Sequence, residues 1–271
     1  MYHPYPPELL SADDPGAVTI ELPQATSPYL ILCDHAGQAI PKRLGDLGLA
    51  AGEIDRHIGW DIGALGLSRR LACQIEATLI HQHYSRLVID CNRTPGSFSS
   101  IPLVSELTTI PGNHHLSAAE IGAREQEIFQ PYHQAIEQTL LARREHGKPS
   151  AVIALHSFTP VFKGEARPWQ VGLLFNRHPQ FALILAELLR EEGDLQVGIN
   201  EPYAMTDATD YTLPIHAERH GLPYVGIEIR QDLISDSEGQ AAWAERFARL
   251  LPLLWQRWER EFGVDGGGQE R

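Results

Sequence analysis

The chain has 271 residues, of which 43% are hydrophobic and 21% charged, an ordinary globular composition that disfavours disorder. A formal net charge of −13 argues against nucleic acid or an anionic membrane as a partner, because both favour a basic surface. No apolar run approaches the roughly 18 residues that span a bilayer, and the N-terminal stretch lacks the pattern of a signal peptide. The three cysteines, Cys33, Cys73 and Cys91, are too few and too widely spaced for a disulfide framework, so we expect a cytoplasmic protein with reduced thiols.

Strand-like and helix-like patterns alternate along the chain. Short apolar segments rich in β-branched residues predict strands at 17–22, 29–33, 78–82, 86–91, 151–157, 169–176, 195–199 and 224–229. Helical patterns cover about 60–76, 117–146, 180–191 and 238–262, and Ser117 with Glu120 predicts a capping box for the second. Because the strands are apolar on both faces and separated by helices, we predict a single α/β domain over 1–271, a three-layer α/β/α fold with a mainly parallel central sheet. Residues 1–15 and 263–271 are expected to be peripheral or flexible.

Polar side chains collect where the predicted strands end, which is where ligands bind in such a sheet. Four strand ends carry them: Asp34-His35, Asn92-Arg93, His156-Ser157, and Glu228 with Arg230 two residues later on the same face. One polar strand end is easily explained by packing. Four of them together predict a functional site.

Metal binding is the simplest use of these residues. A catalytic zinc takes three protein ligands from imidazoles and carboxylates and keeps one position open. Among the 13 histidines, His35 and His156 are the strongest candidates because each directly follows an apolar stretch. For the third ligand we favour Asp61, with His57 as its competitor, since the two are four residues apart and share a face if that stretch is helical.

Several of these motifs together resemble a known family. The segments "CDHAGQAIP", "HIGWDIGA", "YSRLVIDCNR", "HSFTP" and "VGIEIRQDLI" occur in the order and approximate spacing of the N-formylglutamate amidohydrolase family, over about residues 29–234. The segments "HSFTPVFKGEARPW" and "NEPYAMTDATDYTLPIHAERHG" differ from those of its best-studied members, so the resemblance is to a different branch. It therefore implies the reaction class more strongly than the substrate.

The family looks like a distant relative of the zinc carboxypeptidases, which implies their phosphorylase/hydrolase-like fold and a Zn²⁺ cofactor. By that resemblance Asn92 and Arg93 grip a substrate carboxylate, and Glu228 is the general base. The carboxypeptidase pattern has a carboxylate ligand three residues after the first histidine, and here that position is Gln38, a poor zinc ligand. The third ligand must then come from elsewhere, which is why Asp61 matters.

The chemistry of the residues themselves is compatible with these roles. Arg93 offers a rigid fork for a carboxylate, and a cluster of Arg86, Arg93 and Arg230 would give an acidic protein a locally basic site for an anionic substrate. Arg86 is equally explained by an internal pair with Asp90, and Arg230 almost as well by a pair with Asp210 or Glu201.

Three further residues are predicted to assist the site. Asp34 stands beside a candidate ligand and is expected to orient an imidazole. Tyr211 and His216 lie in a long connection between strands and are candidates for contact with the substrate oxyanion, with simple loop packing as the alternative.

Three functional hypotheses follow. The first is a zinc-dependent amidohydrolase that cleaves the amide bond of a small N-acyl amino acid such as N-formylglutamate. The second is carboxypeptidase-like cleavage of a short peptide or conjugate, and the third is a binding protein on the same scaffold that has lost its metal. Cys33 and Cys91 lie near the predicted site but have no motif for nucleophilic catalysis. The sequence does not define the oligomeric state.

Overall fold

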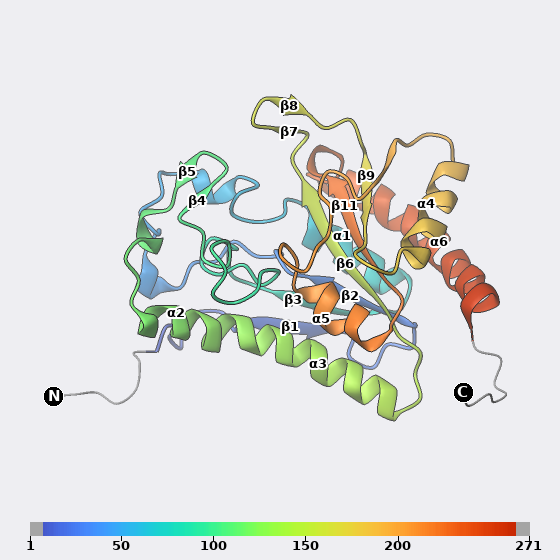
Figure 1. Cartoon of the computed structure of the whole chain (residues 1–271), viewed down its shortest axis with the longest axis horizontal. Coiled ribbons are helices and arrows are strands. Elements are labelled where there is room, and N and C mark those ends of the chain that lie inside the picture. The colour runs from blue at the N-terminus through green and yellow to red at the C-terminus, as the bar shows by residue number, and fades with distance from the viewer. Residues whose placement is uncertain (1–7, 264–271) are drawn as a thin grey trace.

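A seven-stranded mixed sheet forms the centre of the molecule (Figure 1). The computed structural model describes residues 8–263. The strand order is β1-β3-β2-β6-β11-β9-β10. The four central strands β3, β2, β6 and β11 are mutually parallel, as are β9 and β10, whereas β1 pairs antiparallel with β3 and β9 antiparallel with β11. The predicted mainly parallel sheet is confirmed.

The strands of this sheet are short. They are β1 (Val18–Glu21), β2 (Tyr29–Cys33), β3 (Thr78–Gln82), β6 (Ala151–Phe158), β9 (Val171–Leu174), β10 (Val197–Ile199) and β11 (Tyr224–Arg230). Two small hairpins project from the upper part of the molecule in Figure 1: β4 (Val104–Ser105) with β5 (Thr108–Thr109), and β7 (Val161–Phe162) with β8 (Glu165–Ala166).

Helices cover both faces of the sheet, which gives the predicted three layers. They are α1 (Ala64–Gln74), α2 (Ala118–Arg124), α3 (Gln130–Glu145), α4 (Gln180–Glu191), α5 (Thr212–His216) and α6 (Ser237–Phe262). In β2, Ile31 and Cys33 pack with α1, α4 and α6, whereas Leu30 and Leu32 pack with α3 and α5 on the opposite face. Every residue of β2 is buried, because a strand with helices on both sides has no solvent face.

The predicted helix over 117–146 is interrupted by a π-helical turn, Glu125–Phe129, between α2 and α3. Its start is as predicted: the Ser117 side chain accepts from the backbone N–H of Glu120, and the Glu120 carboxylate accepts from the N–H of Ser117. The helix predicted from residue 60 begins only at Ala64. Residues 57–59 form a turn, so His57 and Asp61 do not share a helix face.

One predicted strand is wrong. Residues 86–91 form a turn and an irregular segment, although Leu87, Val88 and Ile89 are fully buried. The turn is fixed by a backbone hydrogen bond from Val88 N–H to the carbonyl of Ser85 and by donation from Asn92 N–H to the carboxylate of Asp90. Asn92 and Arg93 therefore do not follow a strand, although they still reach the site described below.

Part of the predicted peripheral N-terminus is packed. The backbone N–H groups of Leu9 and Leu10 donate to the Glu127 carboxylate at 2.7 and 2.8 Å, and Leu9 is buried. The rest of that expectation, residues 1–7 and 264–271, lies outside the described residues. Within residues 8–263, no helix is both long enough and apolar enough to cross a membrane.

Candidate metal centre and active site

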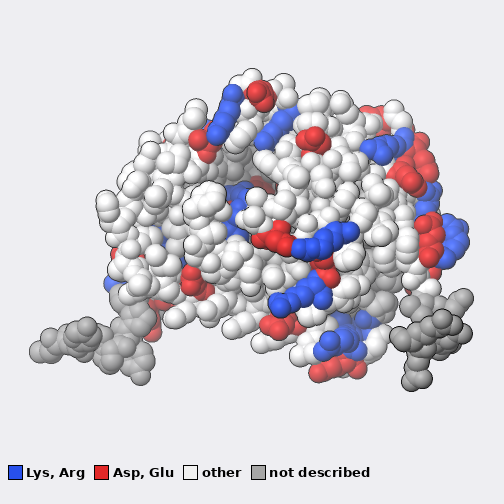
Figure 2. Space-filling view, viewed as in Figure 1, with Lys and Arg blue, Asp and Glu red and all other residues white. Residues whose placement is uncertain are grey.

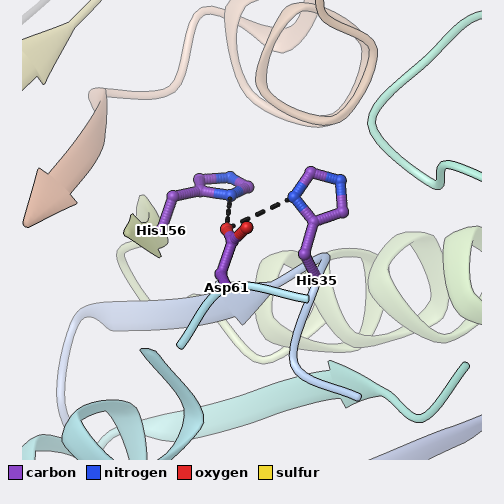
Figure 3. A group of neighbouring side chains, drawn as sticks. All are labelled: His35, Asp61 and His156. Atoms are coloured by element: carbon purple, nitrogen blue, oxygen red, sulfur yellow. Dashed lines mark hydrogen bonds and ion pairs between the residues drawn. The ribbon is translucent and has the colours of Figure 1, made fainter. Parts of the chain in front are cut away.

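Three buried side chains from separate segments converge at one edge of the sheet (Figure 3). His35 follows β2 in a turn, His156 lies near the end of β6, and Asp61 precedes α1. The backbone N–H of Asp61 donates to the carbonyl of His35 at 3.0 Å, which ties the two segments together. One potential ligand atom from each residue lies within 4.8 Å of the others, so the cluster could hold a metal ion.

Both imidazoles turn the same nitrogen toward Asp61. The Nδ1 atoms of His35 and His156 lie 3.3 and 2.8 Å from Oδ2 of Asp61 (Figure 3). The ring centroids are 5.0 Å apart. Two imidazole nitrogens and a carboxylate oxygen directed at one point are the donor set of a catalytic zinc site.

A carboxylate faces the outer nitrogen of each imidazole. His35 Nε2 is 2.7 Å from Asp90 Oδ1, and His156 Nε2 is 3.1 Å from Asp34 Oδ2. Ligating histidines commonly donate their second ring N–H to such a carboxylate, which leaves the first nitrogen free for a metal. This pairing supports the assignment of Nδ1 as the ligand atom in both residues. Asp34 thus contacts His156, not its sequence neighbour His35.

The pKa values in the cluster move as expected for a network of opposite charges. Burial opposes protonation of His35 and His156, yet the facing carboxylates raise the pKa of each ring, and that of His156 most. Burial would raise the pKa of Asp34 and Asp61, but contact with the two rings lowers both, that of Asp34 to about 2. The cluster is therefore charged at neutral pH, with its carboxylates ionised.

Glu228 stands beside the candidate metal site on the neighbouring strand. In the parallel pair of β6 and β11 it lies directly opposite His156. Its side chain is buried, and Oε2 has no hydrogen-bond partner within the described part of the chain. Burial raises the pKa of Glu228 to about 7, which suits a group that exchanges protons near neutrality.

These residues line a cavity of about 480 Å³. Figure 2 shows this face of the molecule hollowed near its centre, with basic and acidic atoms inside the hollow. Residues of both small hairpins line the cavity, including Val104 and Phe162. Its charged and polar lining comprises His35, His57, Asp61, Arg86, Asp90, Asn92, Arg93, Glu106, His156, Tyr203, Asp210 and Glu228, with the hydroxyl groups of Ser99, Ser105, Ser157, Thr159 and Thr209.

The two arginines of the lining have different partners. Arg86 donates through Nε and Nη2 to Asp90 Oδ2, at 3.1 and 2.7 Å, and its Nη1 lies 3.5 Å from Asp61 Oδ1. The internal pair with Asp90 is therefore present. Arg93 donates through Nη1 to the backbone carbonyls of Asn92 and Thr209. No carboxylate among residues 8–263 forms an ion pair with Arg93.

Asn92 fixes the loop that closes one side of the cavity. Its Oδ1 accepts from the backbone N–H groups of Tyr211 and Thr212, at 2.9 and 3.0 Å, and its Nδ2 donates to Asp210. The Oδ1 atom and one N–H of the Asn92 amide are thereby engaged by the protein.

Three predicted substrate contacts do not line the cavity. Arg230 pairs with Asp232, at 2.8 Å, instead of Asp210 or Glu201. Tyr211 packs edge-on against Phe129 and His133. His216 is buried in contact with His133 at 2.8 Å, and burial lowers its pKa to about 3, so it is a neutral packing residue. The loop-packing alternative describes both residues of this loop.

His57 lines the cavity but is separate from the ligand cluster. Its Nε2 lies 3.6 Å from Oε2 of Glu106 and has no hydrogen-bond partner within residues 8–263. Burial lowers the pKa of His57, so the ring is neutral at neutral pH.

Two supports of the cluster were missed in the sequence. Tyr132 of α3 and Thr212 of α5 donate their hydroxyls to Asp34 Oδ1, at 2.7 and 2.9 Å. Neither lies in a motif, and no local pattern signals a contact across about 100 residues or more. The sequence predicts Asp90 only as a partner of Arg86, whereas in the structure it also contacts Nε2 of His35.

Comparison with known proteins places the chain in a family. A family model described as N-formylglutamate amidohydrolase matches residues 27–235. A crystal structure of a gene product from Agrobacterium tumefaciens is 37% identical, with a TM-score of 0.90, and the match covers 93% of this chain and 100% of that one. The N-formylglutamate amidohydrolase from Ralstonia eutropha JMP134 shares the fold, with 20% identity, a TM-score of 0.62, and coverage of 89% and 98%. A search of curated proteins finds no match. The chain belongs to the N-formylglutamate amidohydrolase family.

Proposed function

We propose that this protein is a zinc-dependent hydrolase that cleaves the amide bond of a small N-acyl amino acid, the family's named example being N-formylglutamate. The observation that carries the proposal is the convergence of His35, Asp61 and His156, with buried Glu228 beside them. Family membership independently supports a hydrolase acting on amide bonds. A cytoplasmic location is part of the proposal, supported by three free cysteines.

Zinc fits this donor set better than magnesium or calcium, because two of the three ligand atoms are imidazole nitrogens. Held by His35, Asp61 and His156, it would polarise an amide carbonyl and make water acidic enough to supply a nucleophile near neutral pH. Asp34 and Asp90 would keep each ring in the tautomer with a free Nδ1.

Glu228 is proposed as the general base. Its unpartnered Oε2 can accept a proton from the attacking water and return it to the leaving nitrogen. A carboxyl group with a pKa near 7 exchanges protons efficiently in both directions at neutral pH.

Arg93 is proposed to hold the α-carboxylate of the substrate. Its backbone partners fix one edge of the guanidinium without neutralising its charge, so it remains available to an anion. Asn92 and Arg86 act indirectly, Asn92 by holding the loop at Tyr211 and Arg86 by neutralising Asp90.

Metal analysis tests the centre of the proposal. The protein purified without chelator should contain stoichiometric zinc, and His35→Ala, His156→Ala and Asp61→Ala should each lose it. Gln38→Ala is the matched control, because Gln38 is exposed and does not line the cavity. If Gln38→Ala loses zinc while Asp61→Ala retains it, the proposed ligand set is wrong.

A substrate panel separates the proposed reaction from carboxypeptidase-like cleavage, which the size of the cavity also accommodates. N-formyl and N-acetyl amino acids should be hydrolysed faster than dipeptides with the same C-terminal residue. A preference for dipeptides would favour the second reaction. The intact donor set argues against a binding protein that has lost its metal.

A further inference from the structure

The charges of the cavity are largely neutralised by the protein itself. Its lining contains five carboxylates and two guanidinium groups: Asp61, Asp90, Glu106, Asp210 and Glu228, with Arg86 and Arg93. Arg86 is paired with Asp90, and Glu106 with Arg56, whose Nη2 lies 2.6 Å away. Asp61 belongs to the metal cluster. Arg93 is thus the one guanidinium of the described lining without a carboxylate partner.

A second carboxylate on the substrate would find no further unpaired cationic side chain in the described lining. Arg230, predicted to add positive charge, pairs with Asp232 and is not part of it. His57 is neutral, because burial lowers its pKa. Asp210, which forms no ion pair within residues 8–263, would instead repel a second anion.

The floor of the cavity is apolar next to the catalytic residues. The strand register places Ala154, Gly226 and Leu174 side by side on β6, β11 and β9, two residues before His156 and Glu228 on the first two strands. A Cβ on Gly226 would meet Leu174 at 3.1 Å and Met205 at 3.2 Å, so this surface is closely packed. Leu174, Met205 and Ala154 all line the cavity and carry no charge.

Arg167 is one further basic residue to consider as a partner for a second substrate carboxylate. It is not part of the lining, and its guanidinium lies over the rings of Phe162 and Tyr203, 4.6 and 4.7 Å from their centroids. It also donates to the Tyr203 hydroxyl at 2.8 Å. These contacts hold the guanidinium against the two rings, outside the lining, without cancelling its charge.

We propose, building on the function proposed above, that the substrate carries a single carboxylate and that its amino-acid side chain is uncharged and apolar. Arg93 holds the α-carboxylate, and the side chain rests on the floor formed by Ala154, Leu174 and Met205. The preferred substrates are N-acyl derivatives of residues such as leucine or methionine, and N-formylglutamate is a poor one.

The test compares N-formylmethionine, N-formylleucine, N-formylglutamine and N-formylglutamate as substrates of the zinc-loaded enzyme. We expect kcat/KM for the two apolar compounds to exceed that for N-formylglutamate on the order of 10–10²-fold, the range that side-chain pockets achieve. An equal or higher value for N-formylglutamate overturns the inference while leaving the amidohydrolase assignment intact.

Binding tests the inference even if none of these compounds is hydrolysed. Calorimetry on zinc-loaded Glu228→Gln should show tighter binding of N-formylmethionine than of N-formylglutamate. The substitution removes a negative charge and so favours the glutamate compound, which makes the comparison conservative. Preferential binding without turnover in the wild type would refute the proposed reaction but support the inference, whereas tighter binding of N-formylglutamate would overturn it.

Two variants locate the origin of the preference. Met205→Gln should lower the ratio of kcat/KM for N-formylmethionine to that for N-formylglycine, which has no side chain and corrects for altered folding. Arg167→Met should not change discrimination against glutamate, and a specific loss of glutamate activity in it would identify a second anion site and overturn the proposal. N-hexanoylglycine tests whether the acyl group occupies the apolar floor. A rise in kcat/KM that is confined to longer acyl groups would assign the floor to the acyl chain instead of the amino-acid side chain.

Discussion

The carboxylates behind the two candidate histidine ligands differ in their own partners. Asp90 faces Arg86, whose charge balances it, whereas Asp34 is held by two neutral hydroxyls from Tyr132 and Thr212. The pKa of His156, beside Asp34, is raised further than that of His35, beside Asp90, where Arg86 opposes protonation. Two causes account for the difference: Arg86 opposes protonation of His35, and Asp61 lies closer to His156, at 2.8 Å against 3.3 Å.

This difference leads to a prediction about metal affinity. Asp34→Asn should weaken zinc binding by about 10–100-fold, the usual effect of losing a carboxylate behind a ligand histidine. Asp90→Asn should also leave Arg86 with only its longer contact to Asp61, which places a less balanced positive charge near the metal and weakens binding further. Competition with a chromophoric chelator measures both. Asp232→Asn is the control, and an affinity of Asp34→Asn equal to that of the control would contradict the role given to Asp34.

The second residue-scale prediction concerns proton transfer. Glu228→Gln keeps the shape of the side chain but cannot accept a proton, so kcat should fall on the order of 10²–10⁴-fold while zinc content stays unchanged. Burial raises the pKa of Glu228 to about 7, and a base must be ionised to act. Activity of the wild type should therefore decline as pH falls through about 7, or through a lower value once a bound cation favours the carboxylate. An unchanged rate in the variant would exclude Glu228 as the base.

At the scale of elements, α3 and α5 position Asp34, the carboxylate that faces His156 of the candidate metal centre. Both contribute one hydroxyl to Asp34, and they pack on the same face of the sheet. A change in the packing of α3 or α5 can therefore alter the position of Asp34 at the end of β2.

Tyr132→Phe tests this connection. It removes one of the two donors to a buried carboxylate oxygen and should lower stability by about 1–3 kcal/mol. Tyr29→Phe is a matched control, because its buried hydroxyl donates to the carbonyl of Leu251 at 2.6 Å, on the opposite face of the sheet. Chemical denaturation should show a loss in both variants. A change in zinc affinity is expected only in Tyr132→Phe, and equal affinities in the two variants would contradict the connection.

The same scale shows what the sequence could predict. In strands such as β2 and β6, odd- and even-numbered residues are all buried. Their continuous apolar sequence predicts such strands, because they occur in sheets that are covered on both faces. The segment 86–91 has the same apolar character but forms a buried turn, and periodicity cannot separate the two. Asn92 and Arg93, which follow this segment, nevertheless line the cavity, because the turn at Asp90 directs the chain toward it.

Asp61 was proposed for a helical reason that the structure does not support. It precedes α1, and its backbone N–H bonds to His35. The prediction of Asp61 rests also on the ligand chemistry, because Gln38 is a poor zinc ligand and the third ligand must then be a carboxylate or a histidine from another segment. Chemistry of the donor set was here a better guide than local periodicity.

For the molecule as a whole, the site joins segments from both halves of the chain. His35 and Asp61 come from the first third, and His156 and Glu228 from the second half. The sequence indicated which strand ends carry chemistry, but the partners Tyr132 and Thr212 depend on how whole layers pack. Such long-range contacts have no local signature, which is why they were missed.

A metal that joins these segments should stabilise the folded chain as a unit. Zinc that binds only the folded state adds about 2.7 kcal/mol at a free concentration 100 times its dissociation constant. Thermal unfolding should therefore occur at a higher temperature with zinc than after chelation. His156→Ala should show no such shift.

The zinc-dependent shift in Tm should also grow with pH. Without metal, the raised pKa values of His35 and His156 mean that their ion pairs with Asp61 and the outer carboxylates stabilise the fold at low pH. That contribution is full below the unfolded imidazole pKa of about 6.5 and is lost as pH rises through the raised folded values. Zinc competes with protons for the same Nδ1 atoms, so it binds better as pH rises. Differential scanning calorimetry at several pH values, with zinc and with chelator, measures both trends. A shift that is independent of pH, or that persists in His156→Ala, would show that zinc stabilises the protein at some other place.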